Sequence, residues 1–212
     1  VSVWCWNTAL AWICGNVCVW KPSEKTPLCS VACQNIWAMI VKKNNLPEGI
    51  SCLVNGDYIV GEYLSTDTSI PLVSATGSTR MGRIVGVKVA ERFGKSLLEL
   101  GGNNAMIISP EADLKITVVG ALFGAVGTCG QRCTSTRRLI IHESIYDSVK
   151  KKLVDAYKQL NIGDPLDETN HVGPLIDKAA VNMYLTAVKD AKKEGGCVVV
   201  EEGVLSGSGY ES

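Results

Sequence analysis

Two cysteines four residues apart, in the stretch AVGTCGQRCTSTRR at residues 125–138, are the first candidates for chemistry. Cys133 lies beside Arg132, with Arg137 close behind. Positive neighbours and free backbone amides favour the thiolate, which is the reactive form of a cysteine. Cys129 has a glycine next to it and no charged neighbour. If one of the two cysteines is a nucleophile, Cys133 is the better candidate.

Glu99 is the candidate for a general base. It lies at the end of the apolar stretch SLLEL and is followed by Gly101 and Gly102. A buried carboxylate in such a place suits a base that works near neutral pH, whereas the alternative is a strand-end glutamate that points to water. The two histidines of the chain form no obvious Cys–His pair with the cysteines. Glu99 could therefore activate a water molecule rather than the thiol.

The turn TGSTRMG at residues 76–82 is a candidate anion site. Gly77 allows a tight bend, Ser78 offers a hydroxyl, and the amides at the start of the following helix could bind a pyrophosphate. The spacing differs from the dinucleotide pattern G-x-G-x-x-G, so a simple strand-to-helix turn is the alternative.

The nine cysteines do not form a recognisable metal or disulfide framework. Three pairs share a four-residue step, and none has the two-residue gap usual for zinc. The chain is too long for a small disulfide-rich domain, so we expect no metal and reduced thiols of a cytoplasmic protein.

Charge and hydropathy exclude two classes of function. Lys+Arg and Asp+Glu are both 21, and such a balance is not typical of proteins that bind nucleic acid. The first twenty residues carry no charge, but polar residues and glycine interrupt them. We therefore expect a buried helix at 8–14 and a strand after it, and no membrane span. The chain begins in mid-pattern without Met, as if cut from a longer protein.

Strands and helices alternate along the chain, which predicts an α/β fold with parallel strands. We expect strands at 16–21, 50–56, 70–75, 96–100, 105–109 and 137–143, and helices at 8–14, 26–44, 58–65, after residue 78 up to Gly94, at 114–127, after Ser144, and at 177–194. The pattern restarts after residue 102. It therefore predicts two domains, 1–102 and 103–212.

Four segments together resemble the aldehyde dehydrogenase superfamily. They are WKPSEKTPL at 20–28, TGSTRMG at 76–82, LLELGGNN at 97–104 and GQRCT at 130–134, in the family's order and with fitting separations. The stretches LLELGGNNA and GTCGQRCTSTRRLIIHES look most like the branch of α-aminoadipic semialdehyde dehydrogenases, the antiquitins.

The resemblance implies a Rossmann-like NAD-binding portion followed by part of an α/β catalytic domain. It implies that Cys133 attacks a small-molecule aldehyde to form a thiohemiacetal, and that Glu99 activates the water that hydrolyses the resulting thioester. Arg132 corresponds to an arginine that binds the carboxylate of the substrate. The cofactor NAD would be bound by Lys21, Glu24, Gly61, Gly77, Ser78 and Leu100.

The resemblance also implies a homo-oligomeric parent enzyme. Glu24 would bond the ribose hydroxyls and repel a 2′-phosphate, so NAD is favoured over NADP. The family's oxyanion asparagine would precede Val1, and its Glu-x-Phe-Gly-Pro segment would follow Ser212. The alternative is a truncated, non-catalytic fragment that binds nucleotide or associates with a full-length subunit.

Overall fold

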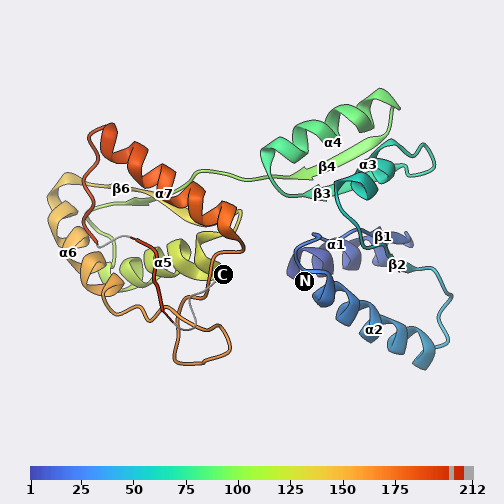
Figure 1. Ribbon diagram of the computed structural model, residues 1–212, viewed down its shortest axis with the longest axis horizontal. Coiled ribbons are helices and arrows are strands. Elements are labelled where there is room, and N and C mark those ends of the chain that lie inside the picture. Colours follow the sequence, from blue (N-terminus) through green and yellow to red (C-terminus); the bar gives the residue numbers. More distant parts are fainter. Residues whose placement is uncertain (201–202, 208–212) are drawn as a thin grey trace. The chain divides into compact units, whose positions relative to one another are not determined.

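The computed structural model describes residues 1–200 and 203–207 (Figure 1). Its contacts divide the chain into two compact units, Val1–Gly101 and Gly102–Ser212. Each unit is described by itself below. The assignment of one unit to NAD binding and of the other to catalysis stays a prediction.

The first unit alternates helices and strands as the sequence predicts. Its strands form two parallel pairs, β1 with β2 and β3 with β4, and these are separate two-stranded sheets among the described residues. The elements are α1 (Ser2–Ile13), β1 (Cys18–Trp20), α2 (Pro27–Lys43), β2 (Ser51–Leu53), α3 (Tyr58–Thr66), β3 (Leu72–Thr76), α4 (Thr79–Glu91) and β4 (Lys95–Glu99).

The second unit is built on one further parallel pair, β5 with β6. Its elements are β5 (Asn104–Ile108), α5 (Leu114–Val126), the 3-10 turn η1 (Gly127–Gly130), β6 (Thr136–Ile141), the 3-10 turn η2 (Glu143–Ile145), α6 (Tyr146–Tyr157) and α7 (Lys178–Lys193). Asp113 caps α5, since its Oδ1 accepts a hydrogen bond from the amide of Lys115 at 2.8 Å. All three strand pairs are parallel, and the predicted α/β class is confirmed.

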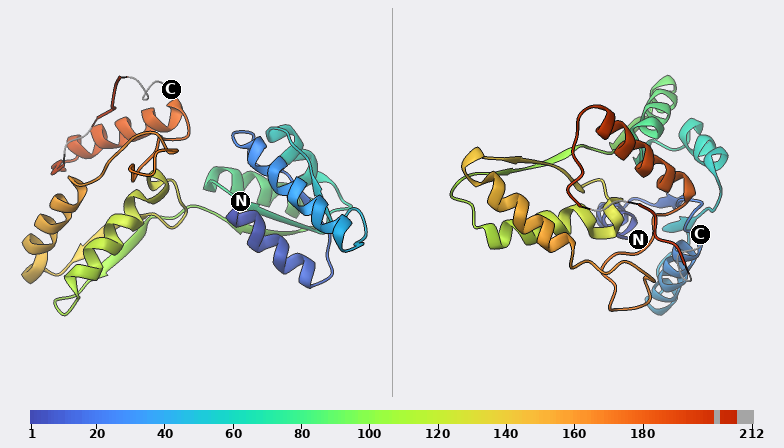
Figure 2. Two further views of the ribbon diagram at one scale, coloured as in Figure 1. Left: turned by 90° about the horizontal axis from the view of Figure 1, so that it is seen from below. Right: turned by 60° about the vertical axis from the view of Figure 1, so that its left-hand side comes forward.

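Each unit has a small apolar core between helix and sheet. In the first unit Val89 of α4 is buried, and α4 packs on β3 and β4. In the second unit Ile108, Ala121 and Val149 are buried, where α5 contacts both β6 and α6 (Figure 2). Helix-on-sheet packing of this kind is the usual way in which parallel strands bury their side chains.

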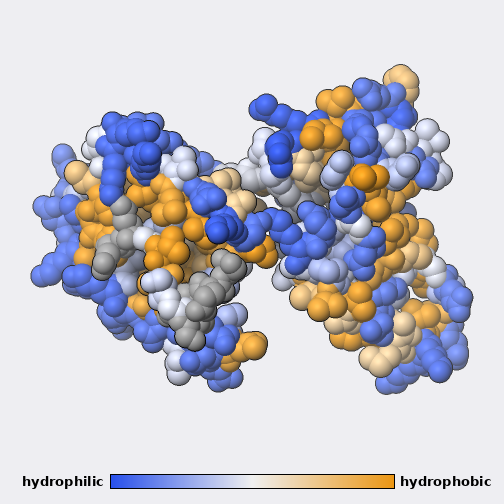
Figure 3. Space-filling model, in the orientation of Figure 1, coloured by the Kyte–Doolittle hydropathy of each residue, from blue (hydrophilic) through white to orange (hydrophobic). Residues whose placement is uncertain are grey.

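Helix α1 is longer than predicted, and it is not a buried helix. On one side, Trp4 stacks on Trp20 with 4.8 Å between the ring centroids, and Trp12 stacks on Trp37 with 4.0 Å. On another side, the described residues of the first unit leave Leu10 and Ile13 exposed, at 67% and 85%. Figure 3 shows that hydrophobic side chains reach the surface of both units. Within the described part of the chain, no helix has the length and apolar character to cross a membrane.

A close approach joins α4 to the end of β4. Gly82 is buried in α4, and a β-carbon there would lie 2.5 Å from a δ-methyl of Leu100. Real β-carbons do not come so close, so the side chain of Leu100 occupies the space that glycine leaves. The residue that follows β4 is thereby held against the helix that opens at the TGS turn.

We expect Gly82→Ala to lower the free energy of unfolding by about 1–3 kcal/mol, because the added methyl overpacks Leu100. Urea unfolding followed by circular dichroism measures this change. Gly120→Ala is the matched control in α5, where a β-carbon would lie 4.0 Å from the nearest atom, a methyl of Met106. Gly120→Ala should leave the free energy of unfolding unchanged or raise it by up to about 1 kcal/mol. Equal effects of the two substitutions would contradict the close approach.

Candidate functional site

Cys133 is exposed in a tight turn that closes on itself. The amide of Ser135 donates to the carbonyl of Arg132 at 3.2 Å, and the Ser135 Oγ accepts from the amide of Arg132 at 3.2 Å. Ser135 is only 2% exposed, so it anchors the turn from the inside. The arrangement leaves the thiol of Cys133 accessible while the backbone on both sides of it is held.

Asn104, the first residue of β5, contacts the same turn. Its Nδ2 donates to the carbonyl of Cys133 at 2.7 Å and to the carbonyl of Ser135 at 3.0 Å. No candidate role was expected of this residue, which is the last of the GGNN segment. Asn104 lies next to Cys133 because β5 pairs with β6 in a particular register. No local pattern in the sequence indicates that register.

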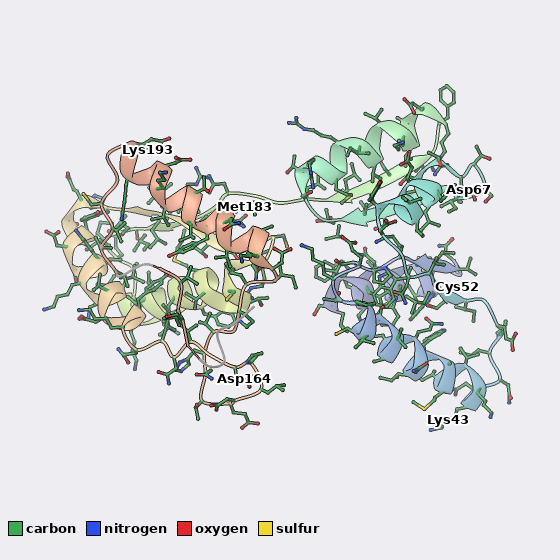
Figure 4. The ribbon with its side chains drawn as sticks, in the orientation of Figure 1. Lys43, Cys52, Asp67, Asp164, Met183 and Lys193 are labelled. Carbon is green, nitrogen blue, oxygen red and sulfur yellow. The ribbon has the colours of Figure 1, made fainter. Side chains whose placement is uncertain are left out.

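Cys129 differs from Cys133 in its surroundings. Its Sγ donates to the carbonyl of Gly173 at 2.6 Å, in the same loop as Asp164, which Figure 4 labels. Burial raises the pKa of the Cys129 thiol. Thr128 and Cys129 both have positive φ, of 55° and 54°, which is uncommon for residues other than glycine. Cys129 therefore acts as a packed residue that ties η1 to the loop before α7.

Arg132 points its guanidinium at the C-terminal turn of α5. Its Cζ lies 4.9 Å from the ring centroid of Phe123, and its Nη2 donates to the Phe123 carbonyl at 3.0 Å. A β-carbon at Gly127 would collide with that Nη2. The Nε of Arg132 is buried and has no hydrogen-bond partner among the described residues. The guanidinium is thus held against the end of α5, with its Nε enclosed.

Glu99 is exposed, so the buried position considered from the sequence is not observed. Side chains alternate along a strand. Leu98 faces α4, and Glu99 therefore lies on the opposite face of β4, which the described residues of this unit leave open. The carbonyl of Glu99 accepts a hydrogen bond from the amide of Gly77 at 3.0 Å. That bond places the TGS turn beside the end of β4.

Ser78 is the N-cap of α4. Its Oγ accepts from the amide of Met81 at 3.1 Å, and the helix begins at Thr79. The predicted strand–turn–helix arrangement is confirmed here. The first turn of a helix carries amides without an intrahelical partner, and those of α4 follow directly on Gly77 and Ser78.

Lys21, Glu24 and Gly61 lie together in the first unit. The Nζ of Lys21 is 3.6 Å from the Oε2 of Glu24, and a β-carbon at Gly61 would lie 3.6 Å from the Cδ of Lys21. The pKa of Glu24 is lowered, first by a hydrogen bond from its own backbone amide and then by Lys21. Glu24 therefore stays ionised at neutral pH.

The predicted site residues fall into three groups. The first unit holds Lys21 with Glu24 and Gly61, and separately Gly77 with Ser78, Glu99 and Leu100; the second unit holds Arg132 with Cys133. Within residues 1–200 and 203–207, no three His, Cys, Asp or Glu side chains gather as a metal site would require.

Comparison with known sequences gives close relatives. The chain is 51% identical over 199 residues to "Alpha-aminoadipic semialdehyde dehydrogenase" of Bos taurus. The matched region covers 94% of this chain and 37% of that protein. It is 46% identical over 204 residues to "Aldehyde dehydrogenase family 7 member A1" of Malus domestica, covering 96% and 40%. The chain thus spans about two fifths of the length of these relatives.

Solved structures of similar fold are aldehyde dehydrogenases too. A point mutant of betaine aldehyde dehydrogenase from Staphylococcus aureus, in complex with NAD+, superimposes with a TM-score of 0.85 at 29% identity, covering 92% of this chain and 39% of that one. The glyceraldehyde-3-phosphate dehydrogenase GapN from Methanocaldococcus jannaschii, complexed with NADP, gives a TM-score of 0.83 at 35% identity, covering 88% and 41%.

The sequence profile of the aldehyde dehydrogenase family matches residues 1–211. The match includes all four segments on which the resemblance was based, and it spans both units. The chain belongs to the aldehyde dehydrogenase family.

Proposed function

We propose that the chain carries the nucleophile and the NAD-binding residues of an enzyme that oxidises an aldehyde to a carboxylate. The observation that carries this proposal is the exposed thiol of Cys133 in a turn that is hydrogen-bonded on both sides. A nucleophile needs an accessible side chain on a fixed backbone, and Cys133 has both.

In the first step the Sγ of Cys133 attacks the aldehyde carbon and forms a thiohemiacetal. The backbone amide of Cys133 donates to the oxygen on which negative charge develops. When bound, NAD supplies an acceptor for the hydride of the aldehyde carbon. The thioester that remains on Sγ is hydrolysed by a water molecule whose proton passes to the carboxylate of Glu99. The products are the carboxylate and the free thiol.

The residues of the first unit fit a dinucleotide. A β-carbon at Gly61 would lie 3.6 Å from the Cδ of Lys21, so glycine adds no side chain beside the lysine stem. Lys21 and Glu24 offer a cation and a carboxylate for ribose hydroxyls. The N-terminus of α4, with Gly77 and Ser78 before it, suits a pyrophosphate. Leu100 is held against Gly82, so the backbone beside Glu99 has a defined position.

NAD rather than NADP is the expected cofactor. The carboxylate of Glu24 is negative at neutral pH, as that of an ordinary glutamate is, and a negative charge there repels a 2′-phosphate. Some structures of similar fold contain NAD and another contains NADP, so this residue of the chain itself supports the choice.

The expected substrate is a semialdehyde that carries a carboxylate, such as α-aminoadipic semialdehyde. The resemblance assigns the carboxylate of the substrate to Arg132, and guanidinium groups bind carboxylates in a bidentate manner. A homo-oligomeric whole enzyme, lysine breakdown as its context, and a cytoplasmic location belong to the same proposal.

We expect Cys133→Ala to reduce the formation of NADH from NAD and α-aminoadipic semialdehyde by about a thousandfold or more in the whole enzyme, because the nucleophile is lost. The assay follows absorbance of NADH. The matched control is Cys197→Ala, which removes another exposed thiol of the second unit and should retain activity. Turnover that persists in Cys133→Ala would exclude this thiol as the nucleophile.

The two cysteines of the opening motif should differ in alkylation. We expect iodoacetamide at neutral pH to modify Cys133 faster than Cys129, because burial and the raised pKa leave Cys129 less accessible and less ionised. Raising the pH should bring the two alkylation rates closer together, because a larger fraction of the Cys129 thiol then ionises. Peptide-resolved mass spectrometry measures both rates, and Cys197 provides an exposed reference thiol. Faster labelling of Cys129 would contradict the assignment.

We expect Glu24→Gln to strengthen the binding of NADP by about tenfold, because a like charge beside the 2′-phosphate is removed. The binding of NAD should weaken or stay the same. Calorimetric titration with each cofactor measures both dissociation constants. Glu48→Gln, an exposed substitution elsewhere in the first unit, is the control for the change in net charge. An unchanged ratio of NAD to NADP affinity would show that Glu24 does not select the cofactor.

A further inference from the structure

The turn that holds Cys133 is closed by its own hydrogen bonds only on the side of Arg132. The bond from the amide of Ser135 to the carbonyl of Arg132 orients the peptide that precedes Cys133. The peptide that follows Cys133 contains the carbonyl of Cys133 itself. That carbonyl is held by the side chain of Asn104, at 2.7 Å.

The same amide group of Asn104 also reaches the carbonyl of Ser135, at 3.0 Å. A carbonyl oxygen only accepts hydrogen bonds, so the group that faces both carbonyls must be an NH₂ with its two donors. With the peptides before and after Cys133 both fixed, the direction of the Cys133 amide and the position of its Cβ are fixed as well. These are the two features on which attack and oxyanion stabilisation depend.

Three features of the fold orient the side-chain amide of Asn104 and leave room for it. In the pairing of β5 with β6, Asn104 is opposite Thr136 but Ala105 is opposite Arg138, so β6 carries one extra residue at this point. Such bulges re-aim a strand locally. The guanidinium of Arg138 donates to the carbonyl of Asn103 at 2.6 Å and 3.1 Å. A β-carbon at Gly102 would lie 3.0 Å from the Oδ1 of Asn104, so glycine leaves room for the amide oxygen.

We propose that Asn104 is a positioning residue for Cys133, and that the chain requires a hydrogen-bond donor at this position. The inference rests on the proposed function, in which Cys133 is the nucleophile. It adds Asn104 to the residues that position the thiol. Asn104 lies in β5, whereas Cys133 precedes β6. The second asparagine of the GGNN segment thereby acts on the nucleophile through the backbone.

The test compares Asn104→Ala, Asn104→Ser and Asn104→Asp in the whole enzyme. Alanine removes the donors, serine keeps one, and aspartate is isosteric but turns acceptors toward two carbonyls. We expect kcat to fall by about a hundredfold for alanine and further for aspartate, as misplacement of a reacting group does. Serine should retain more activity than alanine. The KM for NAD should stay within about twofold, because Asn104 is not among the residues proposed to bind the cofactor.

Hydrogen exchange provides a readout that does not depend on turnover. The amides of Arg132 and Ser135, which donate hydrogen bonds within the turn, should exchange about tenfold faster in the alanine and aspartate variants, because the turn opens more often without the donors of Asn104. Asn103→Asp is the matched control, since it introduces the same charge on the neighbouring exposed residue. Asp113→Ala is a second control, which weakens the cap of α5 and lowers the melting temperature without touching the turn.

The outcomes separate the two proposals. Unchanged exchange of the Arg132 and Ser135 amides, or an equal loss of kcat in Asn103→Asp, would overturn the role of Asn104. A loss of kcat that follows melting temperature alone, with Asp113→Ala falling as far, would overturn it too. A wild-type enzyme that fails to oxidise any aldehyde with NAD would overturn the proposed function, whereas the exchange experiment would still decide whether Asn104 holds the Cys133 turn.

Discussion

The second unit depends on the parallel pairing of β5 with β6. These strands are connected through α5 and η1, so residues about thirty positions apart in the sequence become neighbours only when the strands align. The GGNN segment leads into β5, and the Cys133 turn leads into β6. One shift in register would move every side chain of a strand to the other face and would separate Asn104 from the carbonyls that it holds. The bulge at this end of the pair is therefore part of the site.

A similar relation organises the first unit. The amide of Gly77 binds the carbonyl of Glu99, so β3 and β4 end together and the TGS turn lies next to the proposed base. Parallel α/β sheets gather loops at the carboxyl ends of their strands, which is where ligands of such folds bind. Small residues, Gly77 and Gly82, allow the close approaches that this arrangement needs.

Local patterns were sufficient to predict much of this fold. Alternating apolar runs predicted the order of strands and helices, and the predicted starts of the helices after residue 78 and at 114 are confirmed. Features that depend on distant neighbours were not predictable. Whether Glu99 and α1 are covered depends on what packs against them, and the contact of Asn104 with Cys133 depends on strand register. The positive φ angles of Thr128 and Cys129 were likewise not predictable, because neither residue is a glycine.

Gly127 leaves open the space in which the guanidinium of Arg132 lies. Its backbone angles, φ −54° and ψ 129°, are open to any residue, so what glycine contributes there is the space that the guanidinium occupies. A side chain at position 127 would have to displace the guanidinium from the Phe123 carbonyl, so the residue at 127 limits the directions in which Arg132 can point.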